Sequence, residues 1–122
     1  MSTFDHRTLI QQINQNASLL RKAQPEAMQG FGVLAKAAMA PGAVSEKHKE
    51  LIALAIGITQ HCSGCIGFHV KSLVRLGCTR QELEEMLAIC VYMGGGPALM
   101  YAAETEAAWD AFHSAANINT VA

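Results

Sequence analysis

The sequence predicts an all-helical protein. Apolar residues recur every three or four positions along most of the 122 residues, which is the period of an amphipathic helix. Helix-capping and helix-ending residues stand at the breaks between these stretches, and no stretch has the signal of a β-hairpin. Because a chain of this length suits one core, we expect a single domain over residues 1–122 with about six helices.

Two helices are expected before residue 41. In the first, over residues 7–23, apolar positions follow the helical period while Gln and Asn fill the polar side. Pro25 suits the first turn of the second, over residues 25–40, because its missing N–H is not needed there. The periodic apolar residues are Ile10, Ile13, Ala17 and Leu20 in the first helix and Met28, Phe31, Leu34 and Ala38 in the second.

Four further helices are expected after the break at PGAVS. Ser45 can cap the third helix by accepting a hydrogen bond from a free amide. The fourth begins within the CSGC segment and ends at Gly77, a residue suited to the left-handed position after a helix. Thr79 and Glu82 have the spacing of a capping box for the fifth. The run GGGP then separates the fifth helix from a last one, which Pro97 opens.

Composition and charge exclude several classes of partner. The formal net charge is -1 and no block of Lys and Arg is present, so neither nucleic acid nor an anionic membrane surface is expected as a partner. The N-terminus lacks the pattern of a secretory signal, and no run of about 18 apolar residues occurs, so we expect a cytoplasmic protein. Hydrophobic residues make up 51% of the chain, and we expect the surplus to lie in a subunit interface.

The four cysteines narrow the possible chemistry. Cytoplasmic thiols are kept reduced, so these residues are expected to be catalytic, metal-binding or inert rather than two structural disulfides. Cys78 and Cys90 have no partner thiol nearby in the sequence, and we interpret them as core or interface thiols. Cys62 and Cys65 form a CxxC pair within the stretch HCSGCIGFH.

That stretch supplies two thiols and a base. On a helix, Cys65 lies one turn after Cys62 and His69 one turn after Cys65, so the three share one face. An imidazole can take the proton of a neighbouring thiol, and a helix N-terminus stabilises the resulting thiolate. Glu50, twelve residues before Cys62, is the last charged residue before an apolar run. Its carboxylate is the best candidate to orient His69 and stabilise the imidazolium.

Two other interpretations of the pair stay open. Cys62, Cys65, His69 and His61 could be counted as four zinc ligands. A structural zinc site usually pairs CxxC with ligands from a second segment, and the remaining cysteines stand alone, so zinc is the weaker hypothesis. The two thiols could also be small buried hydrophobes.

The remaining histidines, methionines and aromatic residues predict no second site. We interpret the histidines as solvated surface residues, the methionines as core fillers, and the large aromatic residues as core residues. The histidines are His6, His48 and His113, the methionines Met28, Met39, Met86, Met93 and Met100, and the aromatic residues Trp109 and Phe112.

The segment EKHKELIALAIGITQHCSGCIGFHVKSLVRLGCTRQELEEML resembles the core of the carboxymuconolactone decarboxylase family, in its alkylhydroperoxidase-D-like (AhpD-like) branch. The resemblance covers roughly residues 25–112. It depends on the spacing Glu, eleven residues, CxxC and then His, matched here by Glu50, Cys62, Cys65 and His69. The resemblance implies an all-helical fold with the motif on an antiparallel helix pair, and assembly as trimers or hexamers.

The resemblance also implies roles for these residues. In the peroxidase branch, the cysteine matching Cys65 forms the sulfenic acid, and the one matching Cys62 donates a proton and closes the disulfide. The matching Glu50 and His69 relay protons. Reasoning from the helix terminus alone would favour Cys62 as the thiolate, whereas His69 favours Cys65 as its i+4 neighbour. The division of labour between the two sulfurs therefore stays open.

One position departs from the pattern. The best-known peroxidases of the family resemble CSHC between the thiols, with a further relay histidine where this chain has Gly64. His61, directly before Cys62, is a possible substitute relay.

The predicted function is a thiol peroxidase or disulfide oxidoreductase, an antioxidant enzyme that reduces hydroperoxides through Cys62 and Cys65. An external dithiol is the expected reductant, and no metal, flavin or nucleotide is required. A lyase of the decarboxylase type and a non-enzymatic redox-sensing helical oligomer are the alternatives.

Overall fold

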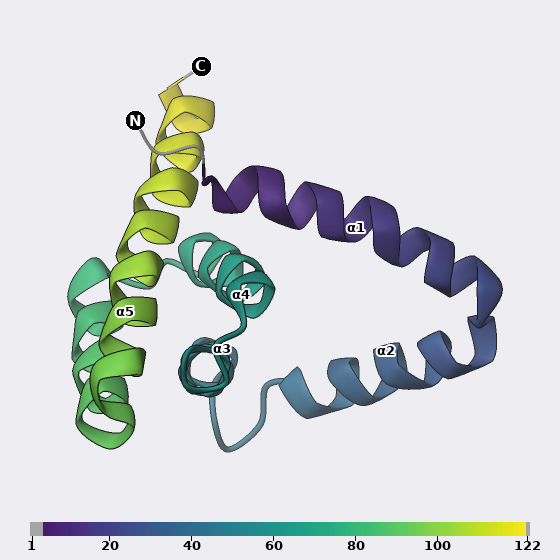
Figure 1. Ribbon diagram of the computed structural model, residues 1–122, viewed down its shortest axis with the longest axis horizontal. Helices are drawn as coiled ribbons and strands as arrows, with labels where there is room; N and C mark the ends of the chain where they lie inside the picture. Colours follow the sequence, from purple (N-terminus) through teal and green to yellow (C-terminus); the bar gives the residue numbers. More distant parts are fainter. Residues whose placement is uncertain (1–3, 122) are drawn as a thin grey trace.

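The chain folds into helices alone over the part that the structure describes. The computed structural model describes residues 4–121, with side chains up to residue 116 (Figure 1). The helices are α1 (His6–Ala23), α2 (Pro25–Met39), α3 (Glu46–Thr59), α4 (Ser63–Arg75) and α5 (Arg80–Val121). The all-helical fold class predicted from the period of the apolar residues is therefore confirmed.

Helices α3, α4 and α5 pack against one another and form the core. Its completely buried members include Leu54, Ile58, Ile66, Leu73 and Leu83. Trp109 and Phe112 are also buried in this core, as expected. Figure 1 shows α3 and α4 lying between α5 on one side and the extended α1–α2 pair on the other.

The start of α1 is fixed to the bundle by a histidine. His6 is 2% exposed, and its Nε2 lies 3.0 Å from Oε2 of Glu104 on α5. Phe4 meets the His6 ring edge-on, with ring centroids 4.5 Å apart. The interpretation of His6 as a solvated surface residue is wrong, because a partner almost a hundred residues away in the sequence satisfies its buried nitrogen.

The rest of the α1–α2 pair projects away from the core (Figure 1). Helix α2 contains no buried residue, and Phe31 and Leu34 are 67% and 64% exposed. The apolar face expected on this helix exists, but nothing within one chain covers it.

Helix α5 contains both of the last two helices expected from the sequence. The backbone is not helical at Gly95, where φ is 72° and ψ is -154°, so the predicted break between these two helices is confirmed. Glycine is suited to this left-handed conformation, and Pro97 begins the next turn. Met93 and Met100 flank the break and are 73% and 62% exposed, so the interpretation of these two methionines as core fillers is wrong.

Helix α5 is also long and apolar enough to cross a membrane. Its best window has a mean hydropathy of 1.5 within Arg80–Ala116. These criteria concern length and composition only, and a central helix of a soluble bundle meets them too. The backbone break at Gly95 and the packing of α5 against α3 and α4 identify it as a bundle helix, not a convincing membrane span.

The predicted capping box starts α5 and also joins it to α3. The backbone N–H of Thr79 donates to Oε1 of Glu82 at 2.9 Å, and the N–H of Glu82 donates to Oγ1 of Thr79 at 3.1 Å. Lys47 Nζ donates to the other carboxylate oxygen at 2.6 Å. This hydrogen bond, followed by the one from Thr79, lowers the pKa of Glu82 to about 2.

Candidate redox site

The CxxC pair lies at the turn that joins α3 to α4. At the end of α3, the N–H of Cys62 donates to the carbonyl of Gly57 at 2.9 Å, and the N–H of His61 donates to that of Ile58 at 3.1 Å. These two bonds form a Schellman motif, which requires a left-handed residue after the helix. His61 takes that position with a φ of 59°. The motif fixes the direction in which the chain enters α4.

The same motif ends α4, where glycine holds the left-handed position. The N–H of Cys78 donates to the carbonyl of Leu73 at 3.0 Å, and the N–H of Gly77 donates to that of Val74 at 3.1 Å. Gly77 has a φ of 77° and is the predicted helix stop. A histidine in the equivalent position before Cys62 is strained by comparison, because left-handed backbone costs an L-residue about 1 kcal/mol.

The two thiols of the motif are joined in the structure. Cys62 and Cys65 form a disulfide with their Cα atoms 5.2 Å apart. Cys62 is the N-cap of α4, and its sulfur accepts a hydrogen bond from the N–H of Cys65 at 3.1 Å. Both residues are half-buried, so the pair is accessible from solvent. The motif is therefore placed at a helix N-terminus, as the sequence predicts.

A glycine on α3 allows this close packing of the two helices. A Cβ atom added to Gly57 would lie 2.9 Å from the Cβ of Cys65, closer than side chains normally approach. Helix α3 can therefore contact the dithiol with its backbone. In the sequence, Gly57 is one residue of an apolar run, and nothing local indicates which helix it faces.

Glu50 and His69 meet between α3 and α4, and His69 lies one helical turn after Cys65. Oε2 of Glu50 on α3 lies 2.6 Å from Nδ1 of His69 on α4. The Glu50 side chain is 10% exposed and the His69 side chain 28% exposed, so the pair is partly shielded from water. An ionised carboxylate only accepts hydrogen bonds, which assigns a proton to Nδ1 and leaves Nε2 of the neutral ring as an acceptor. The ring can then receive one further proton.

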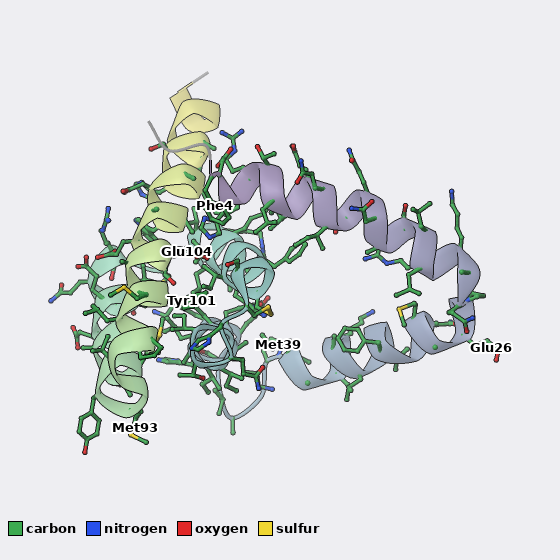
Figure 2. The ribbon with its side chains drawn as sticks, viewed as in Figure 1. Phe4, Glu26, Met39, Met93, Tyr101 and Glu104 are labelled. Atoms are coloured by element: carbon green, nitrogen blue, oxygen red, sulfur yellow. A yellow bond between two sulfur atoms is a disulfide. The ribbon has the colours of Figure 1, made fainter. Side chains whose placement is uncertain are left out.

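His61 lies on the other side of the turn and contacts α5. Its ring stacks on that of Tyr101, with centroids 4.7 Å apart and an interplanar angle of 6°. Figure 2 shows Tyr101 on the side of α5 that faces the α3–α4 pair. Reasoning from the sequence missed Tyr101, because nothing in its local pattern distinguishes it from a core residue. Stacking on Tyr101 explains how a histidine is held in the left-handed conformation.

The position of the missing relay histidine is covered by α1. A Cβ atom added to Gly64 would lie 2.8 Å from Cδ1 of Ile13. A histidine at this position would require Ile13 to move. Gly64, which replaces the histidine of CSHC, therefore leaves room for Ile13 where α1 packs on α4.

The other two cysteines belong to the core. Cys78 is 6% exposed and Cys90 3% exposed. Burial raises the pKa of both thiols, so both stay protonated and unreactive near neutral pH. This agrees with their interpretation as core thiols.

The described residues do not assemble a metal centre. Within residues 4–116, no three His, Cys, Asp or Glu side chains are arranged to hold a metal ion. Cys62 and Cys65 are bonded to each other in a disulfide, so neither sulfur of the zinc hypothesis is a free thiolate ligand in this structure.

Comparison with known proteins decides the family. A model of the carboxymuconolactone decarboxylase family matches residues 25–108. The chain belongs to this family. The apo crystal structure of a carboxymuconolactone decarboxylase family protein from Legionella pneumophila has a TM-score of 0.87 and 48% identity, covering 88% of this chain and 96% of that one.

The curated relatives in this comparison are uncharacterized proteins, and two of them cover most of this chain or two thirds of it. One from Cupriavidus necator is 40% identical over 112 residues, which cover 92% of this chain and 99% of that protein. Another, from the cox locus of Paracoccus denitrificans, is 34% identical over 80 residues, covering 66% of this chain and 72% of that protein. The carboxymuconolactone decarboxylase family, to which the chain belongs, contains enzymes.

Proposed function

We propose that this protein is an alkylhydroperoxidase-D-like thiol peroxidase or disulfide oxidoreductase, which reduces hydroperoxides through Cys62 and Cys65. One observation carries the proposal: a half-buried disulfide at a helix N-terminus lies beside a hydrogen-bonded Glu50–His69 pair on the same two helices. A buried structural disulfide would need no such acid–base pair. A reversible one does, because protons must leave and enter as the bond opens and closes.

The proposed cycle has three steps. His69 takes the proton of Cys65, and the thiolate attacks the terminal oxygen of a hydroperoxide. The O–O bond breaks, the sulfur becomes a sulfenic acid, and the alkoxide takes the proton back from His69 and leaves as an alcohol. Cys62 then attacks that sulfur, which forms the disulfide and releases water. An external dithiol reduces the disulfide and regenerates both thiols.

We assign the attack on peroxide to Cys65 because of its base. His69 lies four residues later on α4, and its orientation by Glu50 leaves Nε2 to accept a proton. The amide contact at the helix N-terminus goes instead to the sulfur of Cys62. That contact suits a resolving and leaving thiolate, because it stabilises negative charge on Cys62 each time the disulfide opens.

His61 is the proposed second proton carrier. It directly precedes Cys62 and is exposed to solvent on one side of its stack with Tyr101. Because Gly64 supplies no side chain, His61 is the nearest histidine in sequence that could exchange protons between Cys62 and solvent.

Single-cysteine variants test the cycle. Cys62→Ser should still react once with a hydroperoxide and keep a sulfenic acid that a dimedone probe labels at Cys65. Cys65→Ser should consume no peroxide beyond background. If the probe labels Cys62 in the Cys65→Ser variant and does not label Cys65 in the Cys62→Ser variant, Cys62 is the thiol that attacks peroxide. No labelling of either variant would contradict peroxidase activity.

Membership of the carboxymuconolactone decarboxylase family favours a lyase as the second candidate. A decarboxylase of this type does not depend on CxxC, so the Cys62→Ser, Cys65→Ser double variant should keep lyase activity and lose peroxidase activity. A protein with neither activity, but with a reversible disulfide, would be a redox-sensing module.

We also propose a homo-oligomer, either a trimer or a hexamer. The side chains of Phe31, Val33 and Leu34 on α2 are 63–67% exposed, and Leu19 and Leu20 near the end of α1 are 65% and 50% exposed. Several large exposed apolar side chains on one helix pair are typical of a protein interface. A location in the cytoplasm is part of the same proposal, since the cycle requires a reducing dithiol supply.

A further inference from the structure

A second concave site lies on α4 away from the dithiol. It is a cavity of about 530 Å³ between the start of α1, the C-terminal half of α4 and the end of α5. Its apolar floor includes Ile10 and Phe112, which are 3% and 7% exposed, and the half-buried Val74. This volume is within the range of small-molecule sites in proteins.

Among the described residues, the rim of this cavity carries positive charge only. Arg7, Lys71 and Arg75 line it, together with two amide side chains, and no Asp or Glu within residues 4–116 does. Arg75 reaches Glu46 at 3.4 Å, but its side chain is 63% exposed, so this pair neutralises little of its charge. Arg7 and Lys71 form no ion pair with any Asp or Glu among residues 4–116.

The cavity and the dithiol lie on different faces of α4. Gly64 and Gly67 face α1, since added Cβ atoms there would meet Ile13 and Ile10. Lys71 and Val74 continue that face by helical spacing. Cys65 faces α3 instead, where it meets Gly57. The cavity is therefore a separate site, and no step of the peroxidase cycle uses it.

We infer that this cavity binds a small amphipathic anion, with a carboxylate or phosphate head on a short hydrocarbon body. Unpaired cations at the rim attract and orient the head, and arginine matches either oxyanion with two parallel hydrogen bonds. The floor of Ile10, Val74 and Phe112 removes the hydrocarbon from water. Each CH₂ group buried there contributes about 0.8 kcal/mol to the free energy of binding. A purely inorganic anion would leave this floor unused.

Calorimetry on the oxidised parent protein tests the inference with octanoate, octyl phosphate, inorganic phosphate and octanol as probes. One or both octyl anions should bind saturably, and the tighter one identifies the preferred head. Octanol and inorganic phosphate should each bind at least about tenfold more weakly, a difference of about 1.4 kcal/mol. Equal binding of octanol and octanoate, or no saturable binding of either octyl anion, would overturn the proposal.

Charge-removing variants locate the site. Arg7→Gln with Lys71→Gln should weaken binding of the octyl anion about tenfold, and Ala115→Phe, which fills the cavity, should abolish it. Arg21→Gln with Lys22→Gln removes the same charge from exposed positions at the far end of α1 and should leave the affinity unchanged. If both double variants lose affinity equally, the anion binds by net charge and the assigned cavity is wrong. Because the disulfide stays closed throughout, the outcome is independent of peroxidase activity.

Discussion

The Glu50–His69 pair is the most informative contact at the scale of single residues. A carboxylate that is 10% exposed needs a partner, and the imidazole 2.6 Å away provides one. The contact fixes the tautomer of the ring, which then presents an acceptor nitrogen. A carboxylate on one helix thereby sets the chemistry of a histidine on the next.

We predict that Glu50→Gln slows alkylation of the reduced dithiol near neutral pH. Glutamine can keep the hydrogen bond but not the charge that stabilises the imidazolium. A loss of about 1.4 kcal/mol of thiolate stabilisation would slow the reaction about tenfold. His69→Asn should have a similar effect, and the double variant should be little worse than the worse single one, because the two groups act as a unit. Alkylation rates across the pH range measure this.

The control for these variants is a test that they fold and assemble like the parent protein. Circular dichroism and the oligomer mass should match those of the parent before rates are compared. If Glu50→Gln is folded and its thiols react as fast as the parent thiols at every pH, the carboxylate has no part in activation.

His61 gives a second prediction at this scale. His61→Ala loses the stack with Tyr101 and keeps the left-handed strain, whereas His61→Gly loses the stack and relieves the strain. The glycine variant should therefore be about 1 kcal/mol more stable to urea than the alanine variant. Both should turn over peroxide more slowly than the parent if the imidazole carries protons. Equal stability of the two variants would show that the backbone at residue 61 is not strained. Turnover equal to that of the parent in both variants would show that the His61 imidazole relays no protons.

The residues with the clearest spacing could be found from the sequence alone. Cys62, Cys65 and His69 lie one turn apart on one helix, so local geometry brings them together. Tyr101 could not be found, because its contact with His61 depends on how α5 crosses the turn. His6 was misinterpreted for the same reason, since its partner Glu104 is distant in the sequence.

At the scale of elements, the α3–α4 pair is the scaffold of the site. Its outer ends could be predicted, because Ser45 caps the start of α3 and Gly77 follows the end of α4, and caps are local signals. The close approach at Gly57 could not, since helical period alone does not show which residue faces a neighbouring helix. The break between the last two helices at Gly95, in contrast, could be predicted from the run GGGP and from Pro97.

The close approach at Gly57 predicts the effect of one added methyl group. Gly57→Ala would place a Cβ 2.9 Å from that of Cys65, so α3 and α4 must separate slightly. We expect a loss of about 1–3 kcal/mol in the free energy of unfolding and slower closing of the disulfide. Urea denaturation and the rate of disulfide formation measure these effects. Gly42→Ala is the control, because it lies in an exposed loop with nothing within 4 Å of the added atom.

At the scale of the whole molecule, the extended α1–α2 pair is the main departure from a compact bundle. Its apolar residues were expected from the helical period, and the surplus of apolar composition indicated an interface. Which residues stay uncovered could not be predicted, because that depends on where α2 lies relative to the bundle. We propose α2, with its exposed Phe31 and Leu34, as this interface.

We predict a trimeric or hexameric mass by light scattering at micromolar concentration. Phe31→Ser with Leu34→Ser should lower the mass without loss of helicity within the bundle, because both residues are mostly exposed in one chain. Val44→Ser, at an exposed loop position, should leave the mass unchanged. A parent protein that is monomeric at this concentration would refute the interface.

The most direct test of the redox function is the mass of the reduced parent protein after one equivalent of a hydroperoxide. The proposed cycle predicts the loss of two hydrogens within the peptide that holds Cys62 and Cys65, the release of one alcohol, and recovery of both thiols with a dithiol reductant. Cys78 and Cys90 should keep their protons, because both thiols are buried. If peroxide leaves Cys62 and Cys65 fully alkylatable, the dithiol does not react with peroxide and the proposed function is wrong.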